Sequence, residues 1–412
     1  MKILFIHPNF PGQFRHIATH LAQQDGNQVV GLGDHDGVAR QIGTTPGVVL
    51  RGYKMSRKAT IGVHHYLRNL EESVLRGQAV LRGCLEIKKL GFYPDLICAH
   101  VGWGDALFLR EAFPDSKIIG YLEFFYHSRG ADTGFDPEFP ISLDNRCEVE
   151  TKNSTQLLTW ENCDYGWSPT QWQASLYPEA FHPKIKVIHD GINTKRIMGD
   201  RNATYTLPDG RVLSRKDEVL TLVNRNMEPY RGFHVFMRAL PEIQKRRPKA
   251  VTIIIGSDNE IAYGSKPKNG KTWREALLEE VGSQLDMSRL YFIGQLEYQE
   301  YLQVLQVSAA HVYMTYPFIL SWSMLESMAA ECLLIGSNTP PVAEIIRDGE
   351  NGLLFDFFDK KELADRVEHA LANQAHFEEM RFNARRTIVE KFDLESICIP
   401  QQMDFIRLAL DK

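Results

Sequence analysis

Long apolar runs are absent from this 412-residue chain, and so is any excess of positive charge. No stretch approaches the roughly 20 apolar residues that a membrane-spanning helix needs. The formal net charge is -5, whereas proteins that bind nucleic acids neutralise phosphates with a basic surface. The apolar start, residues 1–6, turns polar at His7 and is too short for a secretory signal. We therefore expect a cytoplasmic protein with no nucleic-acid partner.

Cysteine and the common catalytic motifs are scarce as well. The six cysteines are scattered without a CxxC pair, so we expect small apolar residues in a reducing compartment rather than disulfides. Histidine, cysteine and acidic residues show no metal-ligand spacing. The GxSxG and HExxH motifs of common hydrolases are missing. We therefore expect neither a metal nor a cofactor.

What the chain does contain is an alternation of short apolar runs and longer amphipathic segments, which is typical of strand–helix repeats. Continuous apolar strands of this length suit parallel sheets that are covered on both faces. Strands are predicted at residues 2–6, 28–32, 96–100, 117–122, 185–189, 219–223, 251–255, 290–293, 310–314 and 333–336. Helices are predicted at residues 12–24 and 384–410.

The length of the chain favours two domains. Charged and turn residues dominate between residues 193 and 217, which indicates the linker. We predict an α/β fold of two Rossmann-like, doubly wound domains that face each other across a cleft. The first would span residues 1–194, joined by a C-terminal helix at 393–412, and the second residues 195–392. A ligand would bind where the strands end.

Two arginines, Arg225 and Arg231, flank the turn between a predicted strand and a helix that opens near Gly232. Backbone N–H groups at a helix N-terminus and guanidinium groups together form an anion site. Two solvated loop arginines would look the same in the sequence. Both interpretations stay open.

An acidic residue, Glu326, opens an apolar helix after the strand-like run that ends at Thr315. A carboxylate beyond the carboxyl end of a parallel strand can bind the vicinal hydroxyls of a ribose. Alternatively, it stabilises the helix dipole by under about 1 kcal/mol. Position alone does not decide between these roles.

Three further stretches give weaker signals. Gly12, in the turn after the first strand, would let the backbone approach a diphosphate, or it belongs to a simple turn. Residues 264–272 nearly spell a P-loop, but one residue too many separates the glycines. Residues 51–90 carry nine basic residues against three acidic ones, which suits an anionic membrane surface or a solvated helix face.

In their order and spacing, these stretches resemble the motifs of family 4 glycosyltransferases with the GT-B fold. The resemblance covers nearly the whole chain. Residues 187–193 are similar to the family's "IPNGVD", 224–232 to its "GR…KG" with Arg231 at the lysine position, 293–296 to its "FLG.V", 325–329 and 344–349 to its most recognisable region, and 384–410 to its returning tail helix.

The resemblance implies a metal-independent hexosyltransferase that retains the anomeric configuration. The residues that would bind the donor are Gly12, Arg225, Arg231, Ser321, Trp322, Ser323 and Glu326. The catalytic groups would be Arg225, Arg231, Glu123 and His127. Cationic side chains and a helix dipole would stabilise the departing nucleotide. The donor would be a UDP- or GDP-sugar, and the acceptor a saccharide or a lipid-linked saccharide.

The chain departs from the family's pattern at three places. The family has two glutamates separated by seven residues, and Phe318 stands at the first, so we expect sugar recognition to differ. Glu123 stands where the family often has a histidine after a strand, and His127 follows four residues later. The glycine pair usual in the first turn is reduced to Gly12 alone, after Pro11.

We therefore expect a glycosyltransferase of glycan or glycolipid biosynthesis. It would be cytoplasmic, with peripheral contact to the inner face of the membrane through residues 51–90. Two alternatives remain, because fold alone does not fix function. One is a nucleotide-sugar epimerase or hydrolase on the same fold. The other is a catalytically inactive nucleotide-sugar-binding homologue, which Phe318 would favour.

Overall fold

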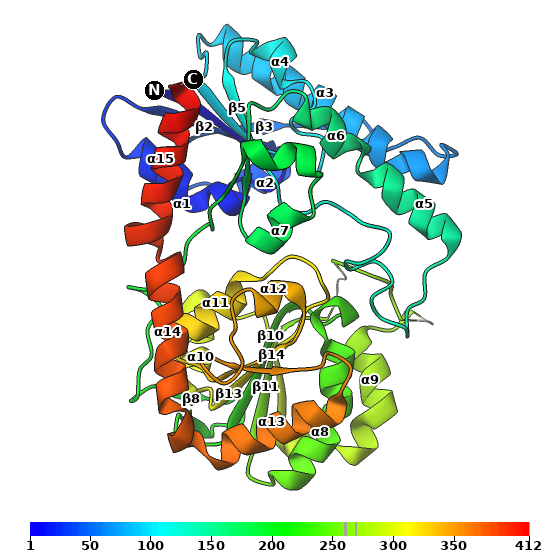
Figure 1. The fold of residues 1–412 in the computed structure, drawn as a ribbon, viewed down its shortest axis with the longest axis vertical. Coiled ribbons are helices and arrows are strands. Elements are labelled where there is room, and N and C mark those ends of the chain that lie inside the picture. Colours follow the sequence, from blue (N-terminus) through cyan, green and yellow to red (C-terminus); the bar gives the residue numbers. More distant parts are fainter. Residues whose placement is uncertain (259–261, 268–269, 412) are drawn as a thin grey trace. The chain divides into compact units, whose positions relative to one another are not determined.

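The computed structural model describes residues 1–258, 262–267 and 270–411. The chain divides into two compact units (Figure 1). Unit 1 comprises Met1–Gly191 and Leu394–Lys412, and unit 2 comprises Ile192–Asp393. Each unit is built around one parallel β-sheet with helices, so the predicted α/β class with two doubly wound domains is confirmed.

Unit 1 holds a seven-stranded sheet in the order β3-β2-β1-β4-β5-β6-β7, and all of its neighbouring strands are parallel. The strands are β1 Lys2–Ile6, β2 Gln28–Asp34, β3 Val49–Tyr53, β4 Leu96–His100, β5 Lys117–Tyr121, β6 Tyr165–Ser168 and β7 Ile185–Val187. The strand order reverses between β1 and β4. In open α/β sheets, ligands bind at the carboxyl ends of the strands at such a switch point.

The helices of unit 1 are α1 Arg15–Ala22, α2 His35–Ala39, α3 Arg68–Lys89, α4 Leu109–Ala112, α5 Leu143–Lys152, α6 Ser154–Trp160, α7 Gln171–Ser175 and α15 Ile399–Leu410. Most of them surround this sheet, while α5 packs against α3 and α6 instead. A 3-10 turn over Gly12–Phe14 precedes α1, so the predicted helix begins with a tighter turn. The last helix, α15, lies beside α1 in Figure 1 and buries Phe405 and Ile406 in the core around Phe5.

Unit 2 repeats the arrangement with six parallel strands in the order β12-β11-β10-β13-β14-β15. The strands are β10 Val219–Asn226, β11 Val251–Ser257, β12 Leu290–Gly294, β13 Ala310–Tyr313, β14 Leu334–Ser337 and β15 Leu353–Phe355. Its switch point lies between β10 and β13.

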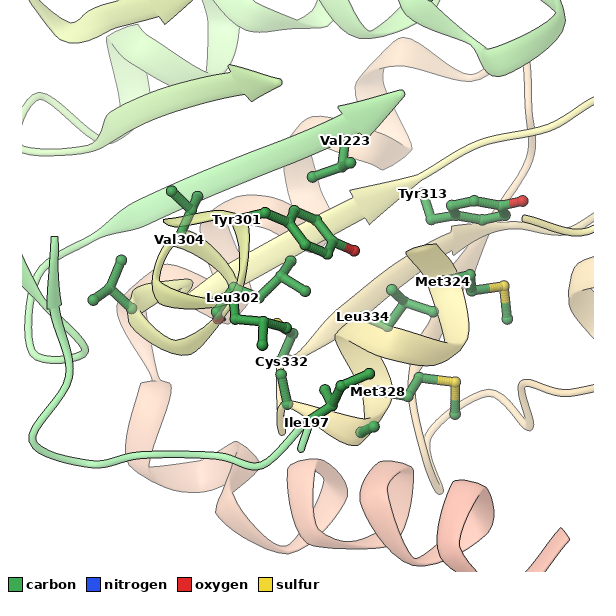
Figure 2. Packing of buried hydrophobic residues seen from close by; sticks show 14 of the residues in the cluster. Ile197, Val223, Tyr301, Leu302, Val304, Tyr313, Met324, Met328, Cys332 and Leu334 are labelled. Atoms are coloured by element: carbon green, nitrogen blue, oxygen red, sulfur yellow. The ribbon is translucent and has the colours of Figure 1, made fainter. Parts of the chain in front are cut away.

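The helices of unit 2 are α8 Phe233–Arg246, α9 Trp273–Val281, α10 Tyr298–Val307, α11 Trp322–Ala329, α12 Pro340–Ala343, α13 Lys360–Ala372 and α14 Glu378–Phe392. Figure 2 shows α10 and α11 packed on one face of the sheet. Leu302 of α10 and Met324 of α11 are buried beside Val223 of β10 and Leu334 of β14. This packing fixes the start of α11, which matters for the site below.

The structure differs from the sequence analysis in three details. The expected linker contains a small antiparallel sheet, β8 Thr204–Thr206 and β9 Val212–Ser214, because Tyr205 and Leu213 are buried in unit 2. Strands β3, β6 and β15 were not predicted, since they are short or lack a continuous apolar run. The tail is two helices, α14 and α15, separated by a π-helical turn over Leu394–Cys398.

Two expectations about composition can be compared with the structure. All six cysteines are free, and five are buried, which agrees with their expected role as small apolar residues. Burial raises the pKa of the Cys84 and Cys163 thiols to about 12. Within the described ranges, no helix is both long and apolar enough to cross a bilayer.

Candidate functional site

The polar residues singled out above gather at the carboxyl ends of the strands in each unit, close to its switch point. In unit 2, Arg231 ends the turn between β10 and α8 and is only 9% exposed. Its Nη1 donates hydrogen bonds to Thr315 Oγ1 at 2.9 Å and to the Ile319 carbonyl at 2.9 Å. A longer bond, 3.3 Å, reaches the Tyr313 hydroxyl.

These bonds leave part of the Arg231 guanidinium unused. Among the residues that the structure describes, none accepts a hydrogen bond from its Nε or Nη2. One nitrogen therefore fastens the side chain to the loop before α11, while the other two can still donate. An arginine held in this way is prepared to bind a phosphate with little further loss of side-chain entropy.

The N-terminus of α11 lies next to Arg231, because the Tyr313 hydroxyl connects them. The Ser321 backbone N–H donates to Tyr313 Oη at 2.8 Å, and the same oxygen accepts from Arg231. Ser321 caps α11 by accepting from the Ser323 N–H at 3.3 Å. Trp322, the first helical residue, is 39% exposed. A helix N-terminus beside a fixed guanidinium is an anion site in its geometry and charge.

Arg225 is the second predicted cation of unit 2. It lies near the end of β10, where the register with β11 shifts, and its side chain is exposed. Within the described part of the chain it has no hydrogen bond or ion pair. The Arg225 side chain is therefore available to a ligand.

Glu228, which the sequence analysis missed, organises the turn between the two arginines. It is 1% exposed, and its Oε2 accepts from the Ala262 N–H at 2.9 Å and the Tyr263 N–H at 3.1 Å. Burial raises the pKa of Glu228, whereas these bonds and the charges of Arg231 and Arg225 lower it. Its only signal in the sequence was an acid between two arginines.

Phe318 lies in an aromatic cluster rather than in a polar one. It is 3% exposed, and its ring meets Tyr263 at 4.7 Å and Tyr230 at 5.5 Å between centroids, close to edge-on. The guanidinium carbon of Arg231 is 5.9 Å from the Phe318 ring. The aromatic rings cover Arg231 on this side.

Glu326 is the fifth residue of α11, so the expectation that it opens the helix is wrong; the helix begins at Trp322. Its Oε1 accepts from the Tyr298 hydroxyl at 2.9 Å, and its Oε2 from the Tyr301 hydroxyl at 2.8 Å. Burial raises the pKa of Glu326, and the two tyrosine bonds oppose that rise. The helix-dipole interpretation weakens, because that effect fades beyond the first turn.

The tyrosines also orient the Glu326 carboxylate. Each carboxylate oxygen accepts one hydrogen bond from a tyrosine and keeps further lone pairs. Figure 2 shows Tyr301 within the apolar cluster, where its ring is fixed by packing. A carboxylate held by two hydroxyls can accept hydrogen bonds from two neighbouring hydroxyls of a ligand.

In unit 1, the turn after β1 brings Gly12 against His7. Gly12 has φ +48°, and a Cβ atom there would lie 2.7 Å from the His7 ring, so only glycine fits without a shift. His7 is buried. Burial, and then the charge of His100, hold the pKa of His7 well below its usual value.

Glu123 follows β5 and joins this group. Its Oε1 accepts from Gln13 Nε2 at 2.7 Å, and its Oε2 is 3.3 Å from His100 Nε2. The His100 ring in turn meets the His7 ring edge-on at 5.2 Å. The ends of three strands, β1, β4 and β5, thus meet in one polar cluster. The sequence analysis missed both histidines, although each one terminates an apolar strand.

His127, the other candidate in unit 1, makes a local contact instead. Its Nε2 lies 2.8 Å from the Leu176 carbonyl and donates to it, and its ring packs on Phe125. Among the described residues, no hydrogen bond connects His127 with Glu123. The structure therefore does not bring these two candidates together.

Two weaker signals remain. The P-loop-like stretch 264–272 includes residues 268 and 269, which lie outside the described residues. In the basic stretch 51–90, several cations are already engaged: Arg57 pairs with Glu71 at 2.8 Å, and Lys89 pairs with Glu86 at 2.7 Å. Glu344, in the last motif block, is exposed at the end of α12.

Comparison with known families gives matches for both halves of the chain. Residues 25–197 match the family described as "Glycosyl transferase family 4 group". Residues 209–387 match the family described as "Glycosyl transferases group 1". Among curated proteins, spore coat protein SA of Bacillus subtilis (strain 168) is 25% identical over 336 residues, covering 76% of this chain and 78% of that protein.

Solved structures show the same fold over the full length. Sucrose-phosphate synthase from Thermosynechococcus elongatus superimposes with a TM-score of 0.71 at 16% identity, covering 100% of both chains. HepE from Anabaena, in complex with UDP and glucose, superimposes with a TM-score of 0.68 at 15% identity, covering 99% of this chain and 100% of the other. The fold is therefore GT-B, as the sequence predicted.

Proposed function

We propose that this chain, which carries a glycosyltransferase family 4 domain and a glycosyltransferase group 1 domain, moves a sugar from a nucleotide-diphosphate donor to an acceptor hydroxyl. One observation carries the proposal. Arg231 is fastened through one nitrogen, keeps two donors free, and lies beside the N-terminus of α11. On the same helix, Glu326 presents an oriented carboxylate. Unit 2 thus offers a diphosphate site and a ribose site on one short element.

In the proposed reaction, the bond between the anomeric carbon and the oxygen of the donor's β-phosphate breaks. The acceptor oxygen forms the new bond to the anomeric carbon with retention of configuration, and the acceptor proton passes to the leaving phosphate. Arg225, Arg231 and the dipole of α11 neutralise the charge that develops on the departing diphosphate, so no metal is needed.

The donor is proposed to be a UDP- or GDP-sugar of the hexose type. Glu326 would accept hydrogen bonds from the ribose hydroxyls, while backbone groups near Ser321, Trp322 and Ser323 contact the phosphates. Structures of Anabaena HepE contain UDP and UDP-glucose, which favours a uridine nucleotide for the first trial. Because Phe318 replaces a carboxylate, the sugar would be recognised without an acidic contact at that position.

Unit 1 is proposed to serve the acceptor. Glu123 is held by Gln13 and His100 at the ends of three strands, where it could accept a hydrogen bond from the acceptor hydroxyl. The approach of Gly12 to the diphosphate and a catalytic part for His127 stay predictions.

The location of the protein is proposed to be cytoplasmic, with peripheral contact to the inner face of the membrane. Ile61 is fully exposed and Leu67 is 46% exposed, and both lie in the basic stretch near the exposed cations Lys54 and Lys58. An apolar residue among cations is suited to anionic lipid. Co-sedimentation with phosphatidylglycerol vesicles, compared with phosphatidylcholine vesicles, tests this contact, and Ile61→Asp should weaken it.

An inactive nucleotide-sugar-binding protein is the second candidate, and the burial of Phe318 favours it, because a sugar-contacting carboxylate is absent. The proposal is tested by melting the protein with UDP, GDP and ADP and their glucose conjugates, since a ligand of the native state raises Tm. NMR analysis of the products then follows with and without saccharide acceptors.

Stabilisation by one nucleotide together with a new glycoside supports the transferase. Binding without any turnover over a broad set of acceptors would support the inactive homologue. Conversion of the free nucleotide sugar without an acceptor would instead indicate an epimerase or a hydrolase.

A further inference from the structure

Unit 1 contains a pocket that the proposed donor site leaves unassigned. Its lining includes Glu72, Arg76, His100, Trp103, Glu123 and Lys152. The pocket lies beyond the carboxyl ends of β4 and β5, next to residues of α3 and the end of α5. It encloses about 80 Å³. Pockets that enclose whole small ligands begin near about 300 Å³. This one therefore suits a single substituent of a ligand.

Lys152 gives the pocket its first cation. Its ammonium lies 3.5 Å from the centre of the Tyr126 ring, and the side chain is half-buried. No carboxylate of the described residues is within ion-pair distance of Lys152. Burial lowers the pKa of Lys152, and the more distant charges of Asp132 and Glu148 oppose this. A partly desolvated ammonium without a counter-ion gains stability when an anion binds beside it.

Arg76 is the second cation, and it is anchored from behind. Its Nη1 donates to the Tyr53 hydroxyl at 3.2 Å, and that hydroxyl donates to Asp105 Oδ1 at 2.8 Å. Asp105 is fully buried and attracts the guanidinium through its charge. The remaining N–H groups of Arg76 stay available at the pocket, because no other hydrogen bond uses them in the described part of the chain.

Neither acidic residue that lines the pocket, Glu72 or Glu123, forms an ion pair with Lys152 or Arg76. Both carboxylate oxygens of Glu123 are already engaged, one with Gln13 and one with His100. Glu72 is exposed to solvent, where its charge is screened. Lys152 and the remaining N–H groups of Arg76 are therefore the donors that the pocket keeps for a ligand.

At the pocket, Trp103 offers an apolar surface. Its side chain is 47% exposed, and its ring lies nearly parallel to the His100 ring, with 29° between the planes. An exposed, flat indole can pack against the C–H face of a sugar ring that is too large to enter the pocket.

We propose that this pocket binds an anionic substituent, a carboxylate or a phosphate, on the acceptor saccharide, with Lys152 and Arg76 as its cationic partners and Trp103 as the platform for the sugar ring. The inference rests on the proposed function, because it defines the acceptor of that reaction. It makes the acceptor an acidic sugar or a sugar phosphate rather than a neutral sugar.

The test measures the binding of four probes to the full chain by ligand-observed NMR. The probes are glucose, glucuronate, glucose 6-phosphate and inorganic phosphate. We expect at least one of the two anionic sugars to bind about tenfold or more tightly than glucose, and the better one identifies the anionic group. Lys152→Met should lower that affinity about tenfold. The matched control, Lys89→Met, removes an exposed lysine of α3 and should change nothing.

Equal binding of glucose and both anionic sugars, or wild-type affinity in Lys152→Met, would overturn the proposal. Trp103→Ala should weaken the binding of the better anionic sugar and leave the binding of inorganic phosphate unchanged. Any other result would contradict the role of Trp103 as the platform for the sugar ring. UDP binding is measured on the same samples. If UDP binds while the anionic sugars do not, the acceptor inference alone fails. If neither UDP nor GDP binds to these samples, the donor site itself is contradicted.

Discussion

Each unit places a glycine between a strand and the α-helix that follows it, and the surroundings of these glycines differ. Gly12 follows β1 and begins the 3-10 turn before α1, whereas Gly232 follows β10 and the 3-10 turn Pro229–Arg231 and directly precedes α8. Both have positive φ, +48° and +67°. A Cβ atom would lie 2.7 Å from the His7 ring in unit 1 and 2.4 Å from Met314 in unit 2. Both turns therefore require a glycine.

The chemistry around these turns is different. In unit 1 the neighbouring strand ends bring together two histidines and Glu123. In unit 2 they bring together Arg231, the hydroxyl groups of Tyr313 and Thr315, and the start of α11. The first set can exchange hydrogen bonds with a hydroxyl, whereas the second can hold an anion. One topology used twice thus provides two distinct binding edges, and the predictions below test this division.

The largest effect is expected from Arg231→Met. Sugar transfer should fall by about 100-fold or more, since a fixed cation that stabilises developing charge is lost. This loss of transfer activity is measured from the initial rates of nucleotide release at saturating acceptor. The control is Arg238→Met, which removes an arginine of α8 that pairs with Glu280. Equal losses in both variants would show that the effect is a general one on unit 2.

The second comparison concerns the two glycines. Gly232→Ala should cost about 2–4 kcal/mol in the free energy of unfolding, because a left-handed residue and an overpacked contact with Met314 add together. Gly12→Ala should cost a similar amount through His7. Gly210→Ala, with φ +87° and open space around it, should cost only about 1–2 kcal/mol. Urea unfolding followed by tryptophan fluorescence measures all three, and equal costs would contradict the account.

The third comparison separates donor from acceptor functions with two matched substitutions. Glu326→Gln should weaken UDP binding about tenfold, because the carboxylate's charge-assisted hydrogen bonds to the ribose are lost. Glu123→Gln should leave UDP binding unchanged and reduce transfer. Titration calorimetry with UDP distinguishes them. If Glu123→Gln weakened UDP binding as much as Glu326→Gln, the division of labour would be refuted.

The last prediction concerns the dependence of stability on pH. Burial lowers the pKa of His311, on β13, to about 3, and that of His189, in unit 1, to about 4. In the unfolded chain a histidine titrates near about 6.5. Below that pH the unfolded state takes up protons that the folded state does not, so stability should fall from about pH 6.5 downwards, by up to about 1.4 kcal/mol per pH unit for each histidine.

The variant His311→Gln tests this effect. It should flatten the fall in stability with decreasing pH, measured by urea unfolding between about pH 6.5 and about pH 4. The exposed His376→Gln should leave the slope unchanged. If stability falls as steeply with pH in His311→Gln as in the wild type, His311 does not cause the pH dependence.

Much of the fold could be predicted, because a strand that is buried on both faces appears in the sequence as a continuous apolar run. The predicted strand 2–6 coincides with β1, and 96–100 with β4. Strand β3 was missed because it runs along the edge of the sheet with Arg51 exposed, and short edge strands carry little pattern.

The site was predictable only in part, for a different reason. Arg231 and Glu326 could be found because motifs fix them along the chain. His7, His100 and Glu123 come from three separate strands, and Tyr298 reaches Glu326 from another helix. Such groups meet through the order of strands and the packing of helices, which no local spacing records. The sequence therefore indicates single side chains better than the partners that orient them.

The central claim is that the carboxyl edge of unit 2 binds a diphosphate, and Arg225→Ala tests it most directly. Arg225 is exposed and makes no hydrogen bond or ion pair within the described residues, so removing it should not change the Tm of the free protein. The account predicts that the rise in Tm caused by UDP shrinks in this variant, corresponding to about tenfold weaker binding. The control Arg386→Ala, which removes another exposed arginine of unit 2, should keep the full rise. A full rise with Arg225→Ala, or no rise with any nucleoside diphosphate in the wild type, would contradict the claim.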